Sequence, residues 1–182
     1  MERVYSKSEM KVLEAIFNRR SIRKFLNKSI SSQDIETILH AGFCAPSAHN
    51  KRPWHFVVVK DKEKLEAFSQ LNPYTKMFAL ADTAIAVCAD EKRQEVRDYL
   101  YEDSAAAIQN ILLAVHALGL GAVWCGMKKD SEYYHNLAKL CKLPEGIIPI
   151  GLIAIGYPEE EKKGRDRFEE DKVHHEVWSD KE

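Results

Sequence analysis

Arginine and serine side chains alternate in Arg19–Arg23, a segment that we call the ladder. In an extended backbone, alternate residues point to the same side, and four steps of about 3.3 Å would place Arg19 and Arg23 roughly 13 Å apart. A guanidinium suits phosphate because it can donate two parallel hydrogen bonds. This order of cation, hydroxyl and cation therefore suits a long anionic ligand, such as a nucleotide-like cofactor.

The surroundings of the ladder are strongly basic. Residues 18–33 include five basic side chains and no acidic one, although the formal net charge of the whole chain is −1. A run of like charge is commonly a solvated surface, so charge alone favours an exposed basic loop. A binding site becomes the better interpretation because three other segments carry related chemistry.

The first of these segments is APSAHNKRPWHF, residues 45–56. Ser47 and Asn50 can exchange hydrogen bonds with a sugar chain or with the edge of a heterocycle. Proline, serine and asparagine also suit a helix stop and a turn, which is the alternative interpretation.

The other two segments are glycine-rich or basic. In GLGAVWCGM, residues 119–127, glycines would let backbone N–H groups approach a flat ligand closely. The alternative is a helix C-cap at Gly119 or Gly121 followed by a core strand. GRDRF, residues 164–168, adds Arg165 and Arg167.

Other chemistries find little support in the pattern. The four cysteines stand far apart without a C-x-x-C pair, which indicates reduced thiols in a cytosolic protein. The seven histidines show no paired ligand spacing, so we predict no metal site. The sequence also lacks G-x-S-x-G and the phosphate-binding Walker motif.

Hydrophobic periodicity predicts the elements that would position these residues. Helices are predicted over 8–18, from Ser31 to Pro46, and over 61–71, 93–118 and 131–141. Strands are predicted over 54–60, 83–89 and 147–157, with a strand or turn over 121–127. Helices and a few strands intermix, which fits an α+β domain whose sheet is covered by helices.

The composition limits the class of protein. At 45% hydrophobic residues the chain can bury a substantial core, and 182 residues suggest a single domain, 1–182. A pI of about 6.7 argues against a general nucleic-acid or membrane surface. The chain has no run of 18 apolar residues and no apolar signal region at its start, so we expect a cytoplasmic protein.

The four segments together resemble the FMN-dependent nitroreductase family. The shared motifs are R-R-S-x-R-x-F, P-S-x-x-N-x-x-P-W, G-L-G-x-x-W-x-G, and I-G-Y-P followed by a basic pair. They occur in the family's order and at its usual distances, from Leu13 to about Trp178. The resemblance implies a nitroreductase-like α+β fold, with a central, mainly antiparallel sheet flanked by helices.

The resemblance also implies an intertwined homodimer with FMN at the subunit interface. Residues 159–182 would form a C-terminal extension that wraps the partner. That tail is highly charged but includes Phe168, Val173, Val177 and Trp178. A purely disordered tail would rarely keep such apolar side chains, so we expect the tail to pack on a surface.

Twelve residues match the family's cofactor-binding positions: Arg19, Arg20, Ser21, Arg23, Pro46, Ser47, Asn50, Trp124, Cys125, Gly126, Arg165 and Arg167. The resemblance implies that Arg19 and Ser21 contact the phosphate and ribityl end of FMN, and that Arg23 reaches the pyrimidine edge. Pro46, Ser47 and Asn50 would contact the FMN held mainly by the other subunit. The backbone of residues 124–126 would line the ring, and Arg165 and Arg167 would close over the phosphate.

By resemblance, the chain is an oxidoreductase that uses NADH or NADPH to reduce nitroaromatic, quinone or related conjugated acceptors by ping-pong hydride transfer. The flavin would carry the chemistry, so no catalytic side chain is expected. The alternative is a flavin-binding or sensing protein with only incidental reductase activity. Arg52 stands where the family usually has Gln, which would alter the pocket mouth or the preferred substrate. Residues 72–81 or 91–102 would serve as the substrate lid.

Overall fold

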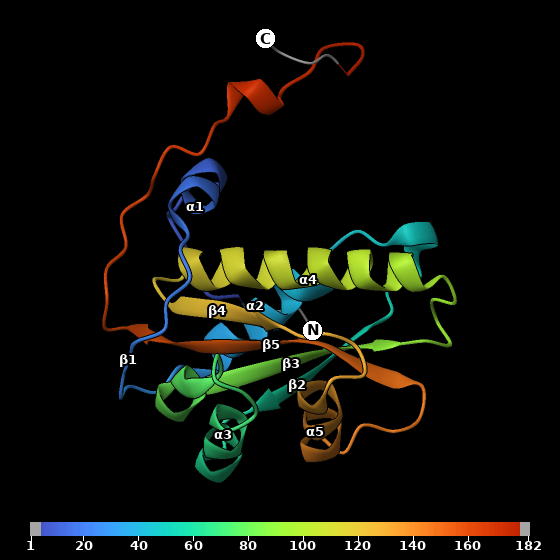
Figure 1. The fold of residues 1–182 in the computed structure, drawn as a ribbon. Coiled ribbons are helices and arrows are strands. Elements are labelled where there is room, and N and C mark those ends of the chain that lie inside the picture. Colours follow the sequence, from blue (N-terminus) through green and yellow to red (C-terminus); the bar gives the residue numbers. More distant parts are fainter. Residues whose placement is uncertain (1–4, 179–182) are drawn as a thin grey trace.

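A five-stranded antiparallel sheet forms the centre of the computed structural model, which describes residues 5–178 (Figure 1). The strands are β1 (Phe25–Leu26), β2 (Trp54–Val59), β3 (Thr83–Asp90), β4 (Gly121–Gly126) and β5 (Ile147–Pro158). β5 pairs with β1, β3 and β4, while β3 also pairs with β2, and all four pairings are antiparallel. The α+β fold with a mainly antiparallel sheet is confirmed.

Residues 5–178 form five helices, most of which cover the sheet (Figure 1). They are α1 (Val12–Asn18), α2 (Ser32–Phe43), α3 (Lys62–Ser69), α4 (Arg97–Ala117) and α5 (Glu132–Leu140), and short 3₁₀ turns occur at η1 (Ala48–Asn50), η2 (Lys76–Leu80) and η3 (Glu170–Lys172). Two cores result. α2 and α4 pack on one face of the sheet, where Ile108 and Ile111 are fully buried. α3, α5 and η2 pack on the other face around Leu65, Phe68 and Leu137.

Two helices begin four residues later than predicted, and one strand was not predicted. α1 begins at Val12 rather than at residue 8, because the Ser8 hydroxyl accepts from the Met10 N–H and holds the backbone in a non-helical turn. α4 begins at Arg97 rather than at residue 93, because the chain first makes a turn at the end of β3. The two-residue strand β1 was not predicted, since so short a pairing has no periodicity of its own.

The segment that follows α1 packs against two glycines that face each other across the sheet. Gly121 and Gly156 are paired across β4 and β5. A Cβ at Gly121 would lie 2.8 Å from Cγ2 of Ile22, and one at Gly156 would lie 2.8 Å from Cδ1 of Phe25. Ile22 and Phe25 are only 8% and 4% exposed. The hollow left by the missing side chains therefore fixes this segment against the sheet.

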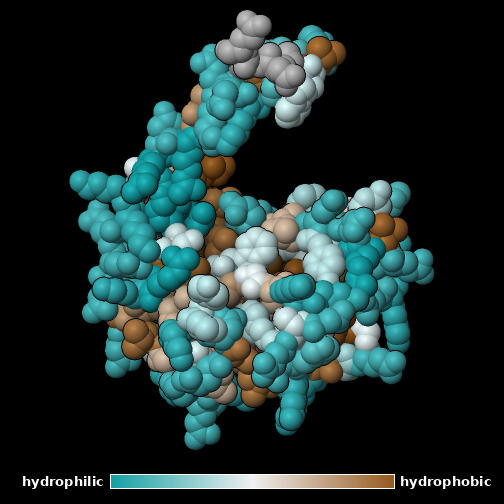
Figure 2. All heavy atoms as spheres, viewed as in Figure 1, coloured by the Kyte–Doolittle hydropathy of each residue, from teal (hydrophilic) through white to brown (hydrophobic). Residues whose placement is uncertain are grey.

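The tail leaves the body of the molecule after β5 and passes α1 (Figure 1). Its apolar side chains stay exposed, with Phe168 at 74% and Trp178 at 80%, and α1 exposes Val12 and Phe17. Figure 2 shows hydrophobic side chains in the recess beneath the projecting tail. Among residues 5–178, no helix is both long enough and apolar enough to cross a membrane.

Gly121→Ala should lower the free energy of unfolding by about 1–3 kcal/mol, the usual cost of overpacking a filled site. Gly126→Ala is the matched control in the same strand, because a Cβ there meets nothing within 4 Å. It should leave stability unchanged, or raise it by about 0.5–1 kcal/mol through the unfolded state. Urea unfolding of both variants measures the difference, and equal effects would contradict the role given to the glycine hollow.

Candidate functional site

The ladder runs alongside β4. Ser21 forms a parallel bridge with Ala122, and the Ile22 N–H donates to the Ala122 carbonyl at 3.0 Å. Because Ile22 turns into the core, its neighbours Ser21 and Arg23 face the opposite way. The alternation expected from the sequence is therefore present.

A groove of about 820 Å³ opens between the end of α1 and residues 164–168. We call it the arginine groove, because its lining includes Arg19, Arg20, Arg165 and Arg167. Burial, then the nearby Arg20 and Arg167, lower the pKa of the Arg19 guanidinium. Within residues 5–178, neither Arg19 nor Arg167 forms a salt bridge. An anion bound here would relieve the repulsion between these cations.

Two other groups in the arginine groove are already engaged. The Arg20 guanidinium donates to the carbonyls of Phe17 at 2.8 Å and Arg19 at 2.7 Å, where it caps the end of α1. Asp166 accepts from the Phe168 N–H at 3.0 Å, so this carboxylate serves the local turn. The cofactor contact predicted for Arg20 stays a prediction, and Arg19 and Arg167 are the freer cations.

A second hollow, of about 690 Å³, lies at the other end of the ladder. We call it the β4 pocket. Its lining joins the ladder, the lid candidate and β4: Arg23, Lys24, Asn72, Pro73, Tyr74, Lys76, Met77, Leu80, Val123, Trp124, Cys125 and Gly126. The structure thus brings together Arg23 and residues 124–126, which stand about one hundred positions apart in the chain.

The thiol of Cys125 faces this pocket and is held by its wall. Its Sγ lies 3.7 Å from the carbonyl oxygen of Tyr74. Burial raises the pKa of the Cys125 thiol, and the positive charge of Arg23 acts in the opposite direction. The net result is a neutral thiol at neutral pH, which fits a wall residue better than a nucleophile.

Trp124 points to the other face of β4. A Cβ built at Gly151 would overlap the indole nitrogen of Trp124, so the ring packs over Gly151 on β5. Successive residues of a strand alternate in direction, which places the Trp124 ring opposite the Cys125 thiol. At this position β4 therefore presents its main chain to the pocket, and the contact of this backbone with the flavin ring stays a prediction.

Residues 72–77 form the outer wall of the β4 pocket. The buried Thr75 hydroxyl accepts from the Asn72 N–H at 3.1 Å and lies 2.8 Å from the Asn72 carbonyl oxygen, which fixes the turn. Tyr74 is left 82% exposed at the rim. Of the two lid candidates, this is the one that reaches the pocket. Residues 91–102 instead begin with a turn braced by the Arg97–Glu91 ion pair at 3.4 Å.

Pro46, Ser47 and Asn50 lie on the α2–β2 connection, and none of them lines the arginine groove or the β4 pocket. The Ser47 hydroxyl accepts from the Arg52 N–H at 2.9 Å, and the buried Asp103 carboxylate accepts from the Ala48 N–H at 2.8 Å. Asn50 and Arg52 have positive φ angles of 55° and 44°. The connection is therefore a tightly held turn that lies outside the two hollows joined by the ladder.

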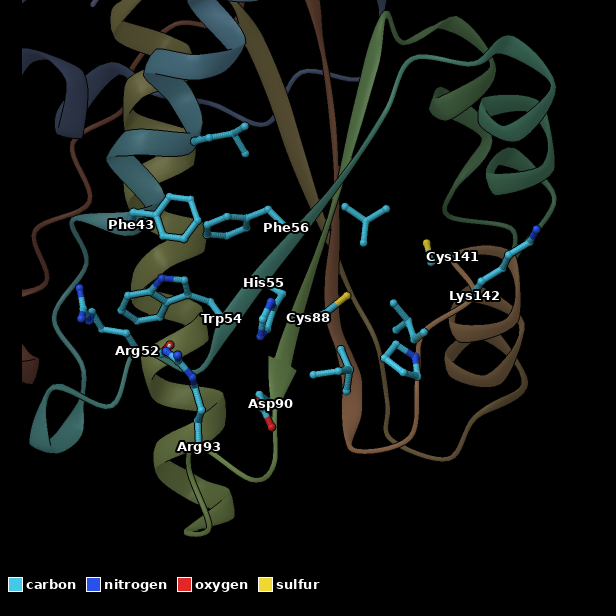
Figure 3. Close-up of a pocket in the computed structure, with 15 residues that line it drawn as sticks. Phe43, Arg52, Trp54, His55, Phe56, Cys88, Asp90, Arg93, Cys141 and Lys142 are labelled. Carbon is cyan, nitrogen blue, oxygen red and sulfur yellow. Dashed lines mark hydrogen bonds between the residues drawn. The ribbon is translucent and has the colours of Figure 1, made fainter. Parts of the chain in front are cut away.

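The lining of a third hollow, of about 820 Å³, includes Arg52, Trp54, Phe56, Cys88 and Lys142 (Figure 3). Phe43 and Phe56 meet edge to face at 4.9 Å, and the Arg93 guanidinium donates to the Arg52 carbonyl at 3.5 Å. No ladder residue lines it. In the described part of the chain, no group of three His, Cys, Asp or Glu side chains is arranged to hold a metal ion.

Sequence reasoning missed Glu160 and Lys162, which contact the ladder directly. The Glu160 carboxylate accepts from the Arg23 N–H at 2.7 Å, and the Lys162 ammonium donates to the Ser21 carbonyl at 2.8 Å. The Arg23 N–H is the main reason why the pKa of Glu160 lies below its usual range. The only signal in the sequence is their place after the I-G-Y-P motif, within a run of charges that resembles a solvated tail.

Comparison with known proteins gives a consistent result. The model of the Nitroreductase family matches residues 16–76 and 72–157. A curated protein of Methanothermobacter thermautotrophicus, named provisionally as an NADH dehydrogenase/NAD(P)H nitroreductase, is 43% identical over 171 residues, which cover 94% of this chain and 90% of that protein. A crystal structure from Bacteroides thetaiotaomicron with the same provisional name is 40% identical, with a TM-score of 0.87 over 92% of this chain and 98% of that one. A structure from Clostridium difficile described as an FMN-dependent nitroreductase is 31% identical, with a TM-score of 0.84 over 91% and 99% of the two chains.

Proposed function

The chain belongs to the nitroreductase family, and on that premise we propose that it is an FMN-dependent oxidoreductase that uses NAD(P)H to reduce nitroaromatic, quinone or related conjugated acceptors. The observation that carries this proposal is the ladder, which joins the arginine groove to a pocket walled by the glycine-containing strand β4. Relatives described as NAD(P)H nitroreductase and FMN-dependent nitroreductase support it.

The donor set of the site fits FMN. Phosphate needs cations that are not already neutralised, and Arg19 and Arg167 meet that need. Ser21 stands in the chain between Arg19, which lines the arginine groove, and Arg23, which lines the β4 pocket, and its hydroxyl suits the ribityl chain. Arg23 and the main chain of residues 124–126 suit the ring, because a fixed cation and open backbone groups can meet its polar edge.

When bound, FMN would supply two-electron redox chemistry between the nicotinamide and the acceptor. The chain's own task is binding and orientation, because the lining of the β4 pocket includes no Asp, Glu or His. Arg23 would stabilise negative charge that develops on the ligand beside it. We propose that donor and acceptor enter the same open pocket in turn, which implies ping-pong kinetics.

A homodimer completes the proposed site. The turn that carries Pro46, Ser47 and Asn50 is rigid but remote from the ladder of its own chain. The exposed apolar side chains of α1 and the tail need a surface to cover them. We propose that the C-terminal extension, residues 159–182, wraps a second copy beyond the point where Glu160 and Lys162 contact the ladder of their own chain. The turn of that second copy would then reach the cofactor.

The purified protein should show flavin absorption near one FMN per chain. Its oxidation of NADH or NADPH should accelerate when a nitroaromatic compound or a quinone is added, with parallel lines in double-reciprocal plots. A yellow protein whose NAD(P)H oxidation no acceptor stimulates would favour the flavin-binding or sensing alternative. A protein that neither carries nor takes up FMN would overturn the proposal.

Arg19→Ala and Arg167→Ala should each weaken FMN binding about tenfold or more, because a charge-assisted contact contributes roughly 1.5–3 kcal/mol. Arg93→Ala is the matched control, since this arginine lines the third hollow. Quenching of FMN fluorescence on titration with apoprotein measures the affinities. Unchanged affinity in both groove variants would contradict the phosphate assignment.

Deleting residues 168–182 should convert the dimer to monomer and release the flavin, because the deletion removes Phe168 and Trp178 from the proposed partner surface. Size-exclusion chromatography with detection at flavin wavelengths follows both losses at once. A truncated protein that stays dimeric and yellow would rule out the wrapped tail.

A further inference from the structure

The charged run EEEKK, residues 159–163, follows β5 directly. Its alternate members Glu160 and Lys162 turn toward the ladder. The Glu160 carboxylate accepts from the Arg23 N–H at 2.7 Å, and the Lys162 ammonium donates to the Ser21 carbonyl at 2.8 Å. The two side chains also pair with each other at 3.1 Å. Within residues 5–178, their neighbours Glu161 and Lys163 are exposed and make no hydrogen bond or ion pair.

These contacts extend the pairing between β1 and β5, but they use side chains in place of a strand backbone. Phe25 pairs with Pro158 in the sheet, and the Glu159 N–H donates to the Lys24 carbonyl at 3.0 Å. Beyond that point the Glu160 carboxylate stands where a partner strand would present a carbonyl, and the Lys162 ammonium stands where it would present an N–H. A hydrogen bond to an ionised group is roughly twice as strong as a neutral one.

The other edge of the ladder is held by β4 through the bond from Ile22 to Ala122. The ladder backbone is thus bonded on both sides, and none of these bonds uses the side chains of Ser21 or Arg23. Both side chains stay available to a ligand. Fixing the backbone while freeing the side chains is what a preorganised binding site requires.

We propose that Glu160 and Lys162 are positioning residues of the cofactor site, which hold the ladder so that Ser21 and Arg23 face the flavin. This inference rests on the function proposed above. The Glu160–Lys162 pair is partly exposed, with 21% and 37% of the side-chain surfaces accessible. Water can therefore replace its bonds, and its loss should loosen the ladder locally without unfolding the protein.

The test compares Glu160→Ala and Lys162→Met with the matched neighbours Glu161→Ala and Lys163→Met. In the apoprotein, amide hydrogen exchange at Arg23 should rise about tenfold in Glu160→Ala and stay unchanged in Glu161→Ala. FMN should bind about tenfold more weakly to Glu160→Ala and to Lys162→Met. Glu160→Gln keeps an acceptor oxygen and should retain most of the amide protection.

The reduction potential of bound FMN distinguishes a positioning role of Glu160 and Lys162 from a purely stabilising role. Arg23→Gln should lower this potential, because it removes the cation beside the ring, and Glu160→Ala should shift it in the same direction. A fall in melting temperature with unchanged potential and affinity would overturn the inference, as would exchange rates equal to those of Glu161→Ala. Failure of the wild type to bind FMN would overturn the proposed function instead. The exchange comparison in the apoprotein would still decide whether Glu160 and Lys162 hold the ladder.

Discussion

The contact between the segment that carries the ladder and two facing glycines constrains the rest of the site. Gly121 and Gly156 leave a hollow that Ile22 and Phe25 fill. Since side chains alternate along an extended backbone, burying Ile22 turns Ser21 and Arg23 outward. One packing event therefore sets the direction of the polar groups, and it aligns the ladder with β4, whose main chain forms the facing wall.

The site concentrates positive charge without neutralising it internally. Burial, then the nearby Arg20 and Arg167, lower the pKa of the Arg19 guanidinium. Two carboxylates of this region are used elsewhere: Asp166 by a backbone N–H, and Glu160 by Arg23 and Lys162. Such an arrangement costs stability in the free protein and returns it when an anion binds. The fold tolerates the repulsion because its two hydrophobic cores lie on the faces of the sheet, away from the groove.

Local signals predicted most of the fold. Apolar runs marked β3 and β5, and amphipathic spacing marked α2 and α3, because burial on one face leaves a periodic trace in the sequence. Alternation likewise predicted the outward direction of Ser21 and Arg23. The roles of Glu160, Lys162 and Tyr74 could not be predicted, because each depends on a neighbour brought close only by the tertiary fold. The contacts expected for Pro46, Ser47 and Asn50 with the cofactor of a second copy stay predictions.

The distance along the chain between the ladder and its supports sets the order in which the site can form. Arg23 and Glu160 are 137 positions apart, and Ser21 and Lys162 are 141 apart. Closing loops of that length is slow compared with forming helices. During synthesis from the N-terminus, the ladder leaves the ribosome early and has no edge to bind until β4 and β5 follow. The candidate site is therefore among the last parts of the chain to assemble, and a newly made chain carries its arginines exposed until its final quarter has folded.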